Sequence, residues 1–330
     1  MKLPRRKFLH LAAGAAALIA LTSTTLAQDW PSRPVTMLVT VAAGGGLDVL
    51  ARILAQRLSE LLGRQVIIEN DGRAGGMSGV ARVAKAVPDG YLFVLGSVGT
   101  FAANQTLYKN PLYNAATDFA PVTLVSEQPN VLVARKDLPA SNLTEFVAYA
   151  KVHQAKMQYG SPGTGSSGHL ACLLFNGALG INVTHVPYRS GAQAMQDLLA
   201  GRIDYSCNFI VTALPQINGG TVNGLATLMK ERTPLLANLA SAHEHGLTNF
   251  DASSWNAIFL PKGTPSAITR KLHDATVATM DTPSVQERLR EIGVTVVAPE
   301  RRSPEYLAKF VPAEIEKWAG PIKASGVSMD

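Results

Sequence analysis

The chain has 330 residues, enough for two domains of ordinary size, and 47% of them are hydrophobic, enough for a complete core. Charged residues make up 16% without a long charged run, which excludes a disordered chain. The formal charge of +6 falls to 26 basic against 24 acidic residues once the first 27 residues are set aside, and this excludes a protein that binds nucleic acid through a basic surface.

The N-terminus has the pattern of an export signal. Arg5 and Arg6 form a twin-arginine pair, residues 11–21 are apolar, and Ala27 ends a stretch of small residues suited to cleavage. The apolar run is shorter than the ~20 residues that a membrane span needs, so a membrane anchor is the weaker alternative. We predict a cleaved twin-arginine signal peptide over residues 1–27 and a mature protein in the periplasm.

The first unit of the mature chain is a strand, a glycine loop and a helix. Residues 35–41 are apolar and β-branched, and residues 47–62 repeat leucine and alanine at steps of three and four. A helix N-terminus carries roughly half a positive charge, and a glycine loop lets the backbone approach a ligand closely, so this loop is a candidate anion site. A tight turn without a ligand is the alternative. The candidate ligand residues here are Val41, Ala42, Ala43, Gly44 and Gly45.

Strands and helices alternate along the rest of the chain. Strands are expected at 65–69, 91–96, 157–161, 184–187, 203–207, 225–229 and 254–260, and helices at 77–86, 143–156, 169–179, 192–199, 266–280, 284–292 and 303–324. Two β-rich runs within 121–135 indicate a crossing between domains. This order predicts an α/β protein with right-handed crossovers.

Several of the loops that follow these strands share one chemistry. Loops after parallel strands meet at one edge of a sheet, where ligands bind. These loops offer backbone N–H and hydroxyl donors with few charges, which suits a carboxylate. The candidate residues are Ser97, Gly99, Ser161, Thr164, Gly165, Ser166 and Ser190. Asp204 is a further candidate, as an acceptor for a ligand amine or hydroxyl; a structural acid that caps a neighbouring helix is the alternative.

Residues 163–168 also fit the dinucleotide pattern G-x-G-x-x-G between a strand and a helix. The next strand, however, is followed by Tyr188 and Arg189 where an acid for the ribose is expected. Because an arginine suits a 2′-phosphate, an NADP-dependent oxidoreductase is kept as an alternative, beside a turn that binds nothing.

Other catalytic and metal patterns fail. No serine lies in Gly-x-Ser-x-Gly, and His243 and His245 lack the spacing of zinc ligands on one helix face. We expect no metal and no cofactor. Cys172 and Cys207 are either a disulfide or two buried thiols, because neither lies in a metal or redox spacing.

Taken together, these segments resemble the Bug family of extracytoplasmic solute receptors, the substrate-binding proteins of tripartite tricarboxylate transporters. The similarity runs from Trp30 to near the C-terminus. Each marker is weak alone, but their order and spacing are specific. The markers are AAGGGLD at 42–48, AR at 51–52, EN at 69–70, GG at 75–76, PDGY at 88–91, DFAP at 118–121, HLA at 169–171, HVPY at 185–188, DLLAG at 197–201 and PKGTP at 261–265.

The resemblance implies a two-lobed type II periplasmic binding protein fold, in which each lobe is a mostly parallel sheet flanked by helices and two crossing strands join the lobes. It implies lobe 1 at 28–128 plus 253–330 and lobe 2 at 129–252. The implied function is the capture of a small carboxylate, and no enzyme activity is expected.

The implied partners are the membrane components of a tripartite tricarboxylate transporter, with a sensor kinase as the alternative, and a monomer is expected. Val41 stands where the family usually has Phe, which implies room for a bulkier or aromatic acid.

Overall fold

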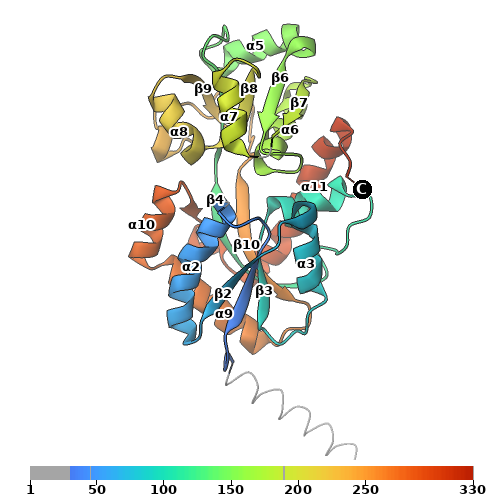
Figure 1. Ribbon diagram of the computed structural model, residues 1–330, viewed down its shortest axis with the longest axis vertical. Helices are drawn as coiled ribbons and strands as arrows, with labels where there is room; N and C mark the ends of the chain where they lie inside the picture. The colour runs from blue at the N-terminus through green and yellow to red at the C-terminus, as the bar shows by residue number, and fades with distance from the viewer. Residues whose placement is uncertain (1–29, 45, 189, 330) are drawn as a thin grey trace, which may run out of the picture.

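The computed structural model describes residues 30–44, 46–188 and 190–329. Two mixed β-sheets, each flanked by helices, lie one above the other in Figure 1. Lobe 1, the lower one, is built on a six-stranded sheet with the order β11-β4-β10-β3-β1-β2, and lobe 2 on a five-stranded sheet with the order β7-β6-β8-β5-β9. The predicted signal peptide, residues 1–27, lies outside the described residues, as do Gly45 and Arg189.

In lobe 1, β1, β2, β3 and β4 run in one direction and β10 and β11 in the other. Its elements are β1 (Val35–Val39), α2 (Gly46–Leu62), β2 (Val66–Asn70), η1 (Arg73–Gly76), α3 (Met77–Ala84), β3 (Leu92–Ser97), η2 (Gly99–Ala103), α4 (Asn104–Leu107), β4 (Phe119–Gln128), β10 (Ser254–Pro261), α9 (Ser266–Met280), α10 (Pro283–Glu291), β11 (Thr295–Val296), η5 (Pro299–Arg301) and α11 (Pro304–Ser325). The short helices after β3, from Gly99 to Leu107, are not expected from the sequence.

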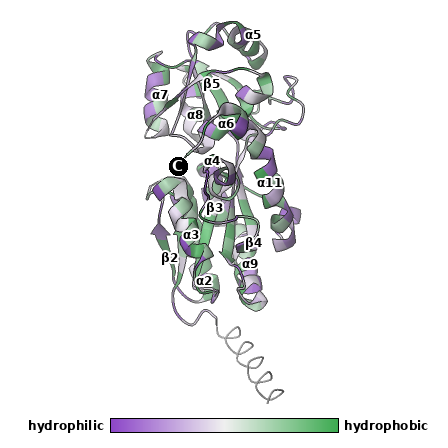
Figure 2. Ribbon diagram, turned by 90° about the vertical axis from the view of Figure 1, so that its right-hand side faces the viewer, coloured by the Kyte–Doolittle hydropathy of each residue, from purple (hydrophilic) through white to green (hydrophobic). Residues whose placement is uncertain are grey.

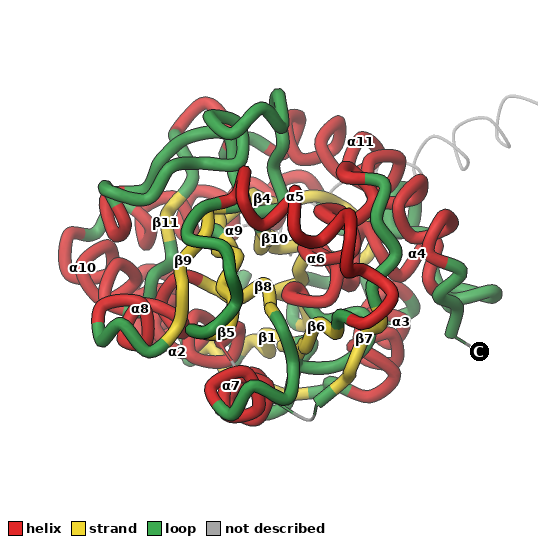
Figure 3. Tube along the Cα trace, turned by 90° about the horizontal axis from the view of Figure 1, so that it is seen from above, coloured by secondary structure: helices red, strands yellow, loops and turns green. Residues whose placement is uncertain are grey.

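In lobe 2, β5 runs against β8 and β9, whereas β6 is parallel to β7 and β8. Its elements are β5 (Asn130–Arg135), α5 (Leu143–His153), η3 (Gln154–Lys156), β6 (Gln158–Ser161), α6 (Ser167–Leu179), β7 (Thr184–Pro187), α7 (Gly191–Leu199), β8 (Tyr205–Phe209), α8 (Ile210–Asn218), β9 (Val222–Thr227) and η4 (Pro234–Leu236). Figure 3 looks down on this lobe and shows its helices around the sheet. Sequence periodicity missed α8, which contains Pro215 in its interior.

Each sheet has an apolar cluster on both faces. In lobe 1, Leu50, Leu54 and Leu58 of α2 pack against one face, and residues of α3, η2 and α11 cover the other. This burial follows from the leucine period of α2, because packing on the sheet removes the apolar side of the helix from water. Within the described parts of the chain, no helix has both the length and the apolarity that crossing a bilayer requires.

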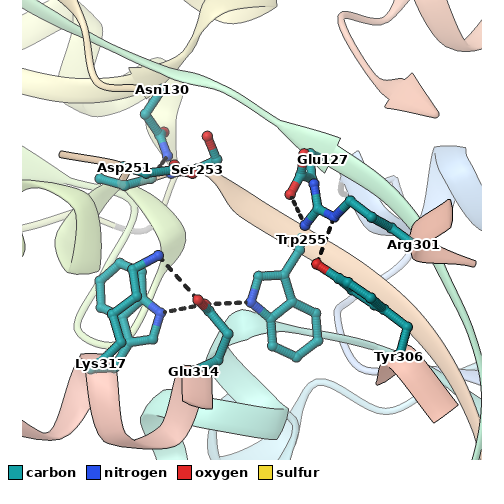
Figure 4. Close-up of polar contacts among 11 residues, drawn as sticks. Glu127, Asn130, Asp251, Ser253, Trp255, Arg301, Tyr306, Glu314 and Lys317 are labelled. Atoms are coloured by element: carbon teal, nitrogen blue, oxygen red, sulfur yellow. Dashed lines mark hydrogen bonds and ion pairs between the residues drawn. The ribbon is translucent and has the colours of Figure 1, made fainter. Parts of the chain in front are cut away.

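Two segments join the lobes. The chain passes from β4 to β5 at Pro129 and returns before β10. The Asn130 side-chain amide donates to the Ala252 carbonyl at 2.8 Å, which ties the two crossings together. Beside them, Arg301 donates to Glu127 at the end of β4 and to the Tyr306 hydroxyl, as Figure 4 shows.

The C-terminal helix α11 is anchored to the returning strand. The buried carboxylate of Glu314 accepts from the indole N–H of Trp255 on β10 at 2.8 Å and from that of Trp318 at 3.0 Å (Figure 4). Lys317 is its ion-pair partner at 3.1 Å. A buried carboxylate requires such partners, so these contacts hold α11 against the crossing.

Helix α11 also contacts lobe 2. Leu170 and Leu173 of α6 are buried in the same apolar cluster as Trp318 and Ile322 of α11. Figure 2 shows α6 close to α4 and α11 where the lobes meet. The lobes are therefore joined by apolar packing as well as by the two crossing segments.

Candidate functional site

The loops after β1 and β3 leave the lobe 1 sheet at the edge that faces lobe 2. They are neighbours because β1 and β3 are parallel, with Val39 beside Leu95. Gly76 lies between them at φ +82°, and a Cβ there would be 2.8 Å from the Thr40 Cβ and 2.7 Å from the Thr100 Cγ2. Only glycine fits this position, so three loops pack tightly at one edge.

The first loop is held in place by Asp48, which is buried. Its carboxylate accepts from the Gly44 N–H (2.9 Å), from the Arg52 Nε (2.9 Å) and from the Asn70 side-chain amide (2.9 Å). Burial alone would raise the pKa of Asp48, but these hydrogen bonds outweigh it and the pKa is lowered. The Gly44 N–H is thus committed to Asp48. The sequence alone suggested that it would be free for a ligand.

The rest of this loop is open to solvent. Ala42, Ala43 and Gly44 are exposed, and Ser97 and Gly99 in the second loop are half-buried. Gly45, another candidate, lies outside the described residues. The described residues of these two loops, 42–44 and 97–99, carry no charged side chain, as an anion site of uncharged donors requires.

Lobe 2 presents a matching edge. The loop of residues 161–166 follows β6, and Ser166 caps α6 by accepting from the His169 N–H at 3.3 Å. Ser190 caps α7 in the same way, and a Cβ on Gly191 would lie 3.5 Å from Pro162, so the two loops are adjacent. Thr164 and Ser190 are exposed.

The Ser161 hydroxyl is less accessible than the sequence suggested. Ser161 is buried, and its Oγ lies 2.7 Å from the His185 Nε2. The Oγ also accepts from the Gly163 N–H at 3.2 Å. These contacts make Ser161 a residue that shapes the loop.

The two edges meet at Gly99 and Gly165. A Cβ built on Gly99 would lie 3.5 Å from the Gly165 carbonyl oxygen, and one built on Gly165 would lie 3.4 Å from Leu107 of lobe 1. Figure 1 shows the strand ends of the two sheets facing each other. The structure therefore brings the loop after β3 of lobe 1 next to the loop after β6 of lobe 2.

Asp204 does not belong to this group. It precedes β8, at the opposite end of the lobe 2 sheet, because β8 is parallel to β6 and Tyr205 pairs with Tyr159. Its carboxylate accepts from the Arg135 Nε (3.0 Å) and from the Gln158 N–H (2.8 Å). The proposal of Asp204 as a ligand acceptor is therefore corrected: it is a structural acid that ties strands together.

The sequence analysis missed polar residues in the strands themselves. Asn256 is buried in the middle of β10, where its amide donates to the Ser126 Oγ at 3.1 Å. Asn208, near the end of β8, donates to the Ser206 Oγ at 2.6 Å. An asparagine beside the apolar residues of β10 was a signal that could have found Asn256.

Two histidines lie behind the loop of residues 161–166. His169 is fully buried; its Nδ1 accepts from the Gly165 N–H at 3.1 Å, and within the described chain its Nε2 has no partner. Its ring centroid is 4.2 Å from that of His185. Burial, with a smaller effect of His185, lowers the pKa of His169 to about 3, and burial lowers the pKa of His185 to about 4. Both rings are therefore neutral near pH 7.

The two cysteines form a disulfide. Cys172 on α6 and Cys207 on β8 are both buried and joined, with a Cα–Cα distance of 5.5 Å. Next to it, a Cβ on Gly168 would lie 2.5 Å from the Cys207 carbonyl oxygen, so α6 lies directly on β8. The disulfide thus fixes the helix whose N-terminus follows the loop of residues 161–166.

Two hollows lie away from these loops. One of about 350 Å³ lies at the far edge of the lobe 1 sheet beside Arg33, Thr36 and Tyr91, and one of about 40 Å³ lies beneath α11 beside Phe259. The candidate site is therefore defined by the loops that meet. Over the stretches that the structure describes, no three His, Cys, Asp or Glu side chains are grouped to hold a metal ion.

Comparison with known proteins gives the family. The family described as "Tripartite tricarboxylate transporter family receptor" (TctC) matches residues 50–327. The chain belongs to this family. A relative described as the "UPF0065 protein in the TAR-I ttuE-ttuC' intergenic region" of Agrobacterium vitis is 40% identical over 316 residues, which cover 93% of this chain and 90% of the relative.

Solved structures of receptors of this kind have the same fold. MatC (Rpa3494) from Rhodopseudomonas palustris with bound malate is 36% identical, with a TM-score of 0.78 over 89% of this chain and 100% of its own. R. palustris Rpa4515 with adipate is 34% identical, with a TM-score of 0.79 over 91% and 99%. The two-lobed fold of a periplasmic binding protein is thereby confirmed.

Proposed function

We propose that this protein captures a small organic acid between its two lobes in the periplasm and delivers it to the membrane components of a tripartite tricarboxylate transporter. The observation that carries the proposal is the meeting of uncharged loops from both lobes at Gly99 and Gly165. Helices α2, α6 and α7 each begin directly after one of the candidate loops, so the partial positive charge of a helix N-terminus lies beside three of these loops. Malate and adipate, bound to two structural neighbours, are small carboxylates of the proposed kind.

The loops provide enough binding energy without a buried cation. A hydrogen bond to a charged group contributes about 1.5–3 kcal/mol, and desolvation of the carboxylate opposes it. Five or six such bonds from the loops at 42–43, 97–99, 164–166 and 190 would leave a net of about 8 kcal/mol, which corresponds to a micromolar Kd.

The direct test is titration calorimetry of the mature protein with malate, adipate and NADP. We expect one of the acids to bind with a micromolar or lower Kd and NADP to give no heat. Heat from NADP alone would favour the oxidoreductase alternative. No heat from any acid would favour a protein that acts only as a signalling partner, for example of a sensor kinase.

A charge at the first loop tests the location of the site. Ala43 is exposed there, so Ala43→Glu places a carboxylate in the loop and Ala43→Gln places a neutral side chain of the same shape. Two like charges about 5 Å apart repel by about 3 kcal/mol at an effective dielectric constant of about 20, a loss of more than 100-fold in affinity. Equal affinities of the two variants would place the ligand elsewhere.

We further propose that the lobes divide at residues 28–128 plus 253–330 and 129–252, and that the mature protein is monomeric. Both crossings fall at these bounds, because β4 ends at Gln128 and β10 begins at Ser254. Intact mass of protein isolated from periplasm should show removal of residues 1–27, and light scattering should give the mass of one chain. A retained leader or a dimer mass would contradict these two points.

A further inference from the structure

Two histidine rings lie against each other behind the loop of residues 161–166. His169 is in the first turn of α6 and His185 is on β7, and their ring centroids are 4.2 Å apart. The ring of Tyr159 is stacked on His185 at 4.9 Å. The two histidines come from separate sequence markers, HLA at 169–171 and HVPY at 185–188, so these markers meet at one place behind the loop.

Each histidine ring holds a different part of this loop. The His169 Nδ1 accepts from the Gly165 N–H at 3.1 Å. The His185 Nε2 lies 2.7 Å from the Ser161 Oγ, which itself accepts from the Gly163 N–H at 3.2 Å. Gly163 and Gly165 both have positive φ, at +119° and +79°. Because a glycine adopts positive and negative φ about equally, these bonds decide the shape of the loop more than the backbone itself does.

Packing alone does not explain a histidine at position 169. The ring is fully buried, and among the described residues its Nε2 has no partner. Because the Nδ1 accepts a hydrogen bond, the proton of the neutral ring is on Nε2, and a buried N–H without a partner destabilises the fold. An aliphatic side chain would avoid this cost. The hydrogen bond from Gly165 is what the histidine adds.

The part of the loop that His169 holds is the part next to lobe 1. A Cβ on Gly165 would lie 3.4 Å from Leu107, and the Gly165 carbonyl oxygen lies 3.5 Å from a Cβ built on Gly99. Thr164 and Ser166, on either side of Gly165, are candidate donors to the ligand. A shift of Gly165 would therefore move these donors and the contact between the lobes together.

We propose that His169 and His185 are positioning residues of the receptor, which hold the loop of residues 161–166 in the shape that receives the acid, through the Gly165 N–H and the Ser161 Oγ, without touching the acid themselves. This inference rests on the proposed function. When such a bond is lost, the free loop rearranges until its N–H meets water, and binding has to return that group to an unpaired state. The affinity then falls by the cost of an unpaired donor, at least about 5-fold.

The test uses the fact that the two rings act through different nitrogens. The amide of asparagine is attached to Cβ, as the ring is, so its oxygen takes the place of Nδ1. The amide of glutamine is one carbon further out and takes the place of Nε2. His169→Asn should therefore keep the bond to Gly165 and His169→Gln should lose it. At the other ring the order is reversed: His185→Gln should keep the contact with Ser161 and His185→Asn should lose it.

Calorimetry with malate and adipate measures the result. At each position, the variant that loses the contact should bind the acid at least about 5-fold more weakly than the variant that keeps it. A role in packing alone would rank asparagine and glutamine in the same order at both positions. The same order at both positions, or equal affinities, would overturn the inference.

Amide hydrogen exchange at Gly165 gives a second readout, which needs no ligand. Exchange should be at least about 5-fold faster in His169→Gln than in the wild-type protein and in His169→Asn. Equal exchange in all three would overturn the inference. If His169→Gln does not fold, nitrogen NMR of the wild-type ring decides: we expect an unprotonated Nδ1 and a protonated Nε2 at pH 7, and a protonated Nδ1 would overturn the inference.

The matched control is Asn176→Ala, which removes a buried asparagine of α6 that accepts from the Tyr205 hydroxyl at 2.8 Å. It should lower stability and keep the affinity of the wild-type protein. A similar loss of affinity in this control would show that any weakening of α6 has the same effect, which would overturn the inference. If the wild-type protein binds neither malate nor adipate, the proposed function fails and this inference fails with it.

Discussion

Acidification should destabilise the protein because two buried histidines cannot take up a proton in the folded state. An unfolded histidine has a pKa near 6.5, whereas burial lowers the pKa of His169 to about 3 and that of His185 to about 4 in the fold. Because the folded pKa values are the lower ones, the stability is fully present above pH 6.5 and is lost as the pH falls toward the folded values.

The structure gives the size of this effect. Between pH 6.5 and about pH 4.5 the unfolded chain binds two more protons at these residues than the folded one, and each proton changes the free energy of unfolding by about 1.4 kcal/mol per pH unit. From pH 7 to pH 5 each histidine contributes about 2 kcal/mol. Because His185 is only half-buried, we expect a total loss of about 3 kcal/mol.

Urea unfolding at pH 7 and pH 5 measures the loss. Carboxylates whose pKa values are lowered in the fold act mainly below pH 5, so this window isolates the histidines. His169→Asn and His185→Asn should each remove part of the pH dependence, whereas His153→Asn, at an exposed residue, should keep it. A wild-type free energy of unfolding that is equal at pH 7 and pH 5 would refute the reasoning.

Four further outcomes follow from local geometry. Gly76→Ala should lower the free energy of unfolding by about 2 kcal/mol or more, because φ is +82° and a Cβ would overlap two threonines. Urea unfolding measures this, and an unchanged urea midpoint would contradict the packing of the loops. Opening the disulfide between α6 and β8 should cost about 3–4 kcal/mol, since it closes a separation of 35 residues, and urea unfolding with and without reductant tests this. Gly177→Cys with Pro321→Cys should form a second disulfide between α6 and α11, visible in the intact mass, because the two Cβ positions are 4.0 Å apart; two free thiols would show that the helices separate. If Val41 leaves room for a bulky acid, Val41→Phe should weaken the binding of benzoate at least about 10-fold relative to malate in calorimetry, and equal changes would dismiss that idea.

Much of the local structure was predictable. The strand over 35–41 and the helix over 47–62 correspond to β1 (Val35–Val39) and α2 (Gly46–Leu62), because alternating and leucine-rich periods depend only on neighbouring residues. The helix α8 was missed because Pro215 in its interior argues against a helix from sequence alone.

The candidate site was predictable only in part. Parallel strands predict that the loops of one sheet share an edge. That Gly99 of lobe 1 lies close to Gly165 of lobe 2 depends on how the two sheets face each other. Asp204 was placed there wrongly, because the sequence does not show which end of a strand faces the other lobe. The hydrogen bond from the Gly44 N–H to Asp48 could not be predicted either. It depends on the Asp48 side chain, in the first turn of α2, reaching back to the loop before the helix.

The sequence by itself determined the α/β class, the family and the uncharged loops, because each of these follows from the residues of short segments. Only the tertiary structure decided that Cys172 and Cys207 form a disulfide and that Asp204 lies at the end of the lobe 2 sheet opposite the candidate loops. It also decided that Asn256 of β10 pairs with Ser97 of β3. These relations depend on strand register and on which sheet edges face each other. Both are set by packing between segments that are distant in the sequence, which no local pattern encodes.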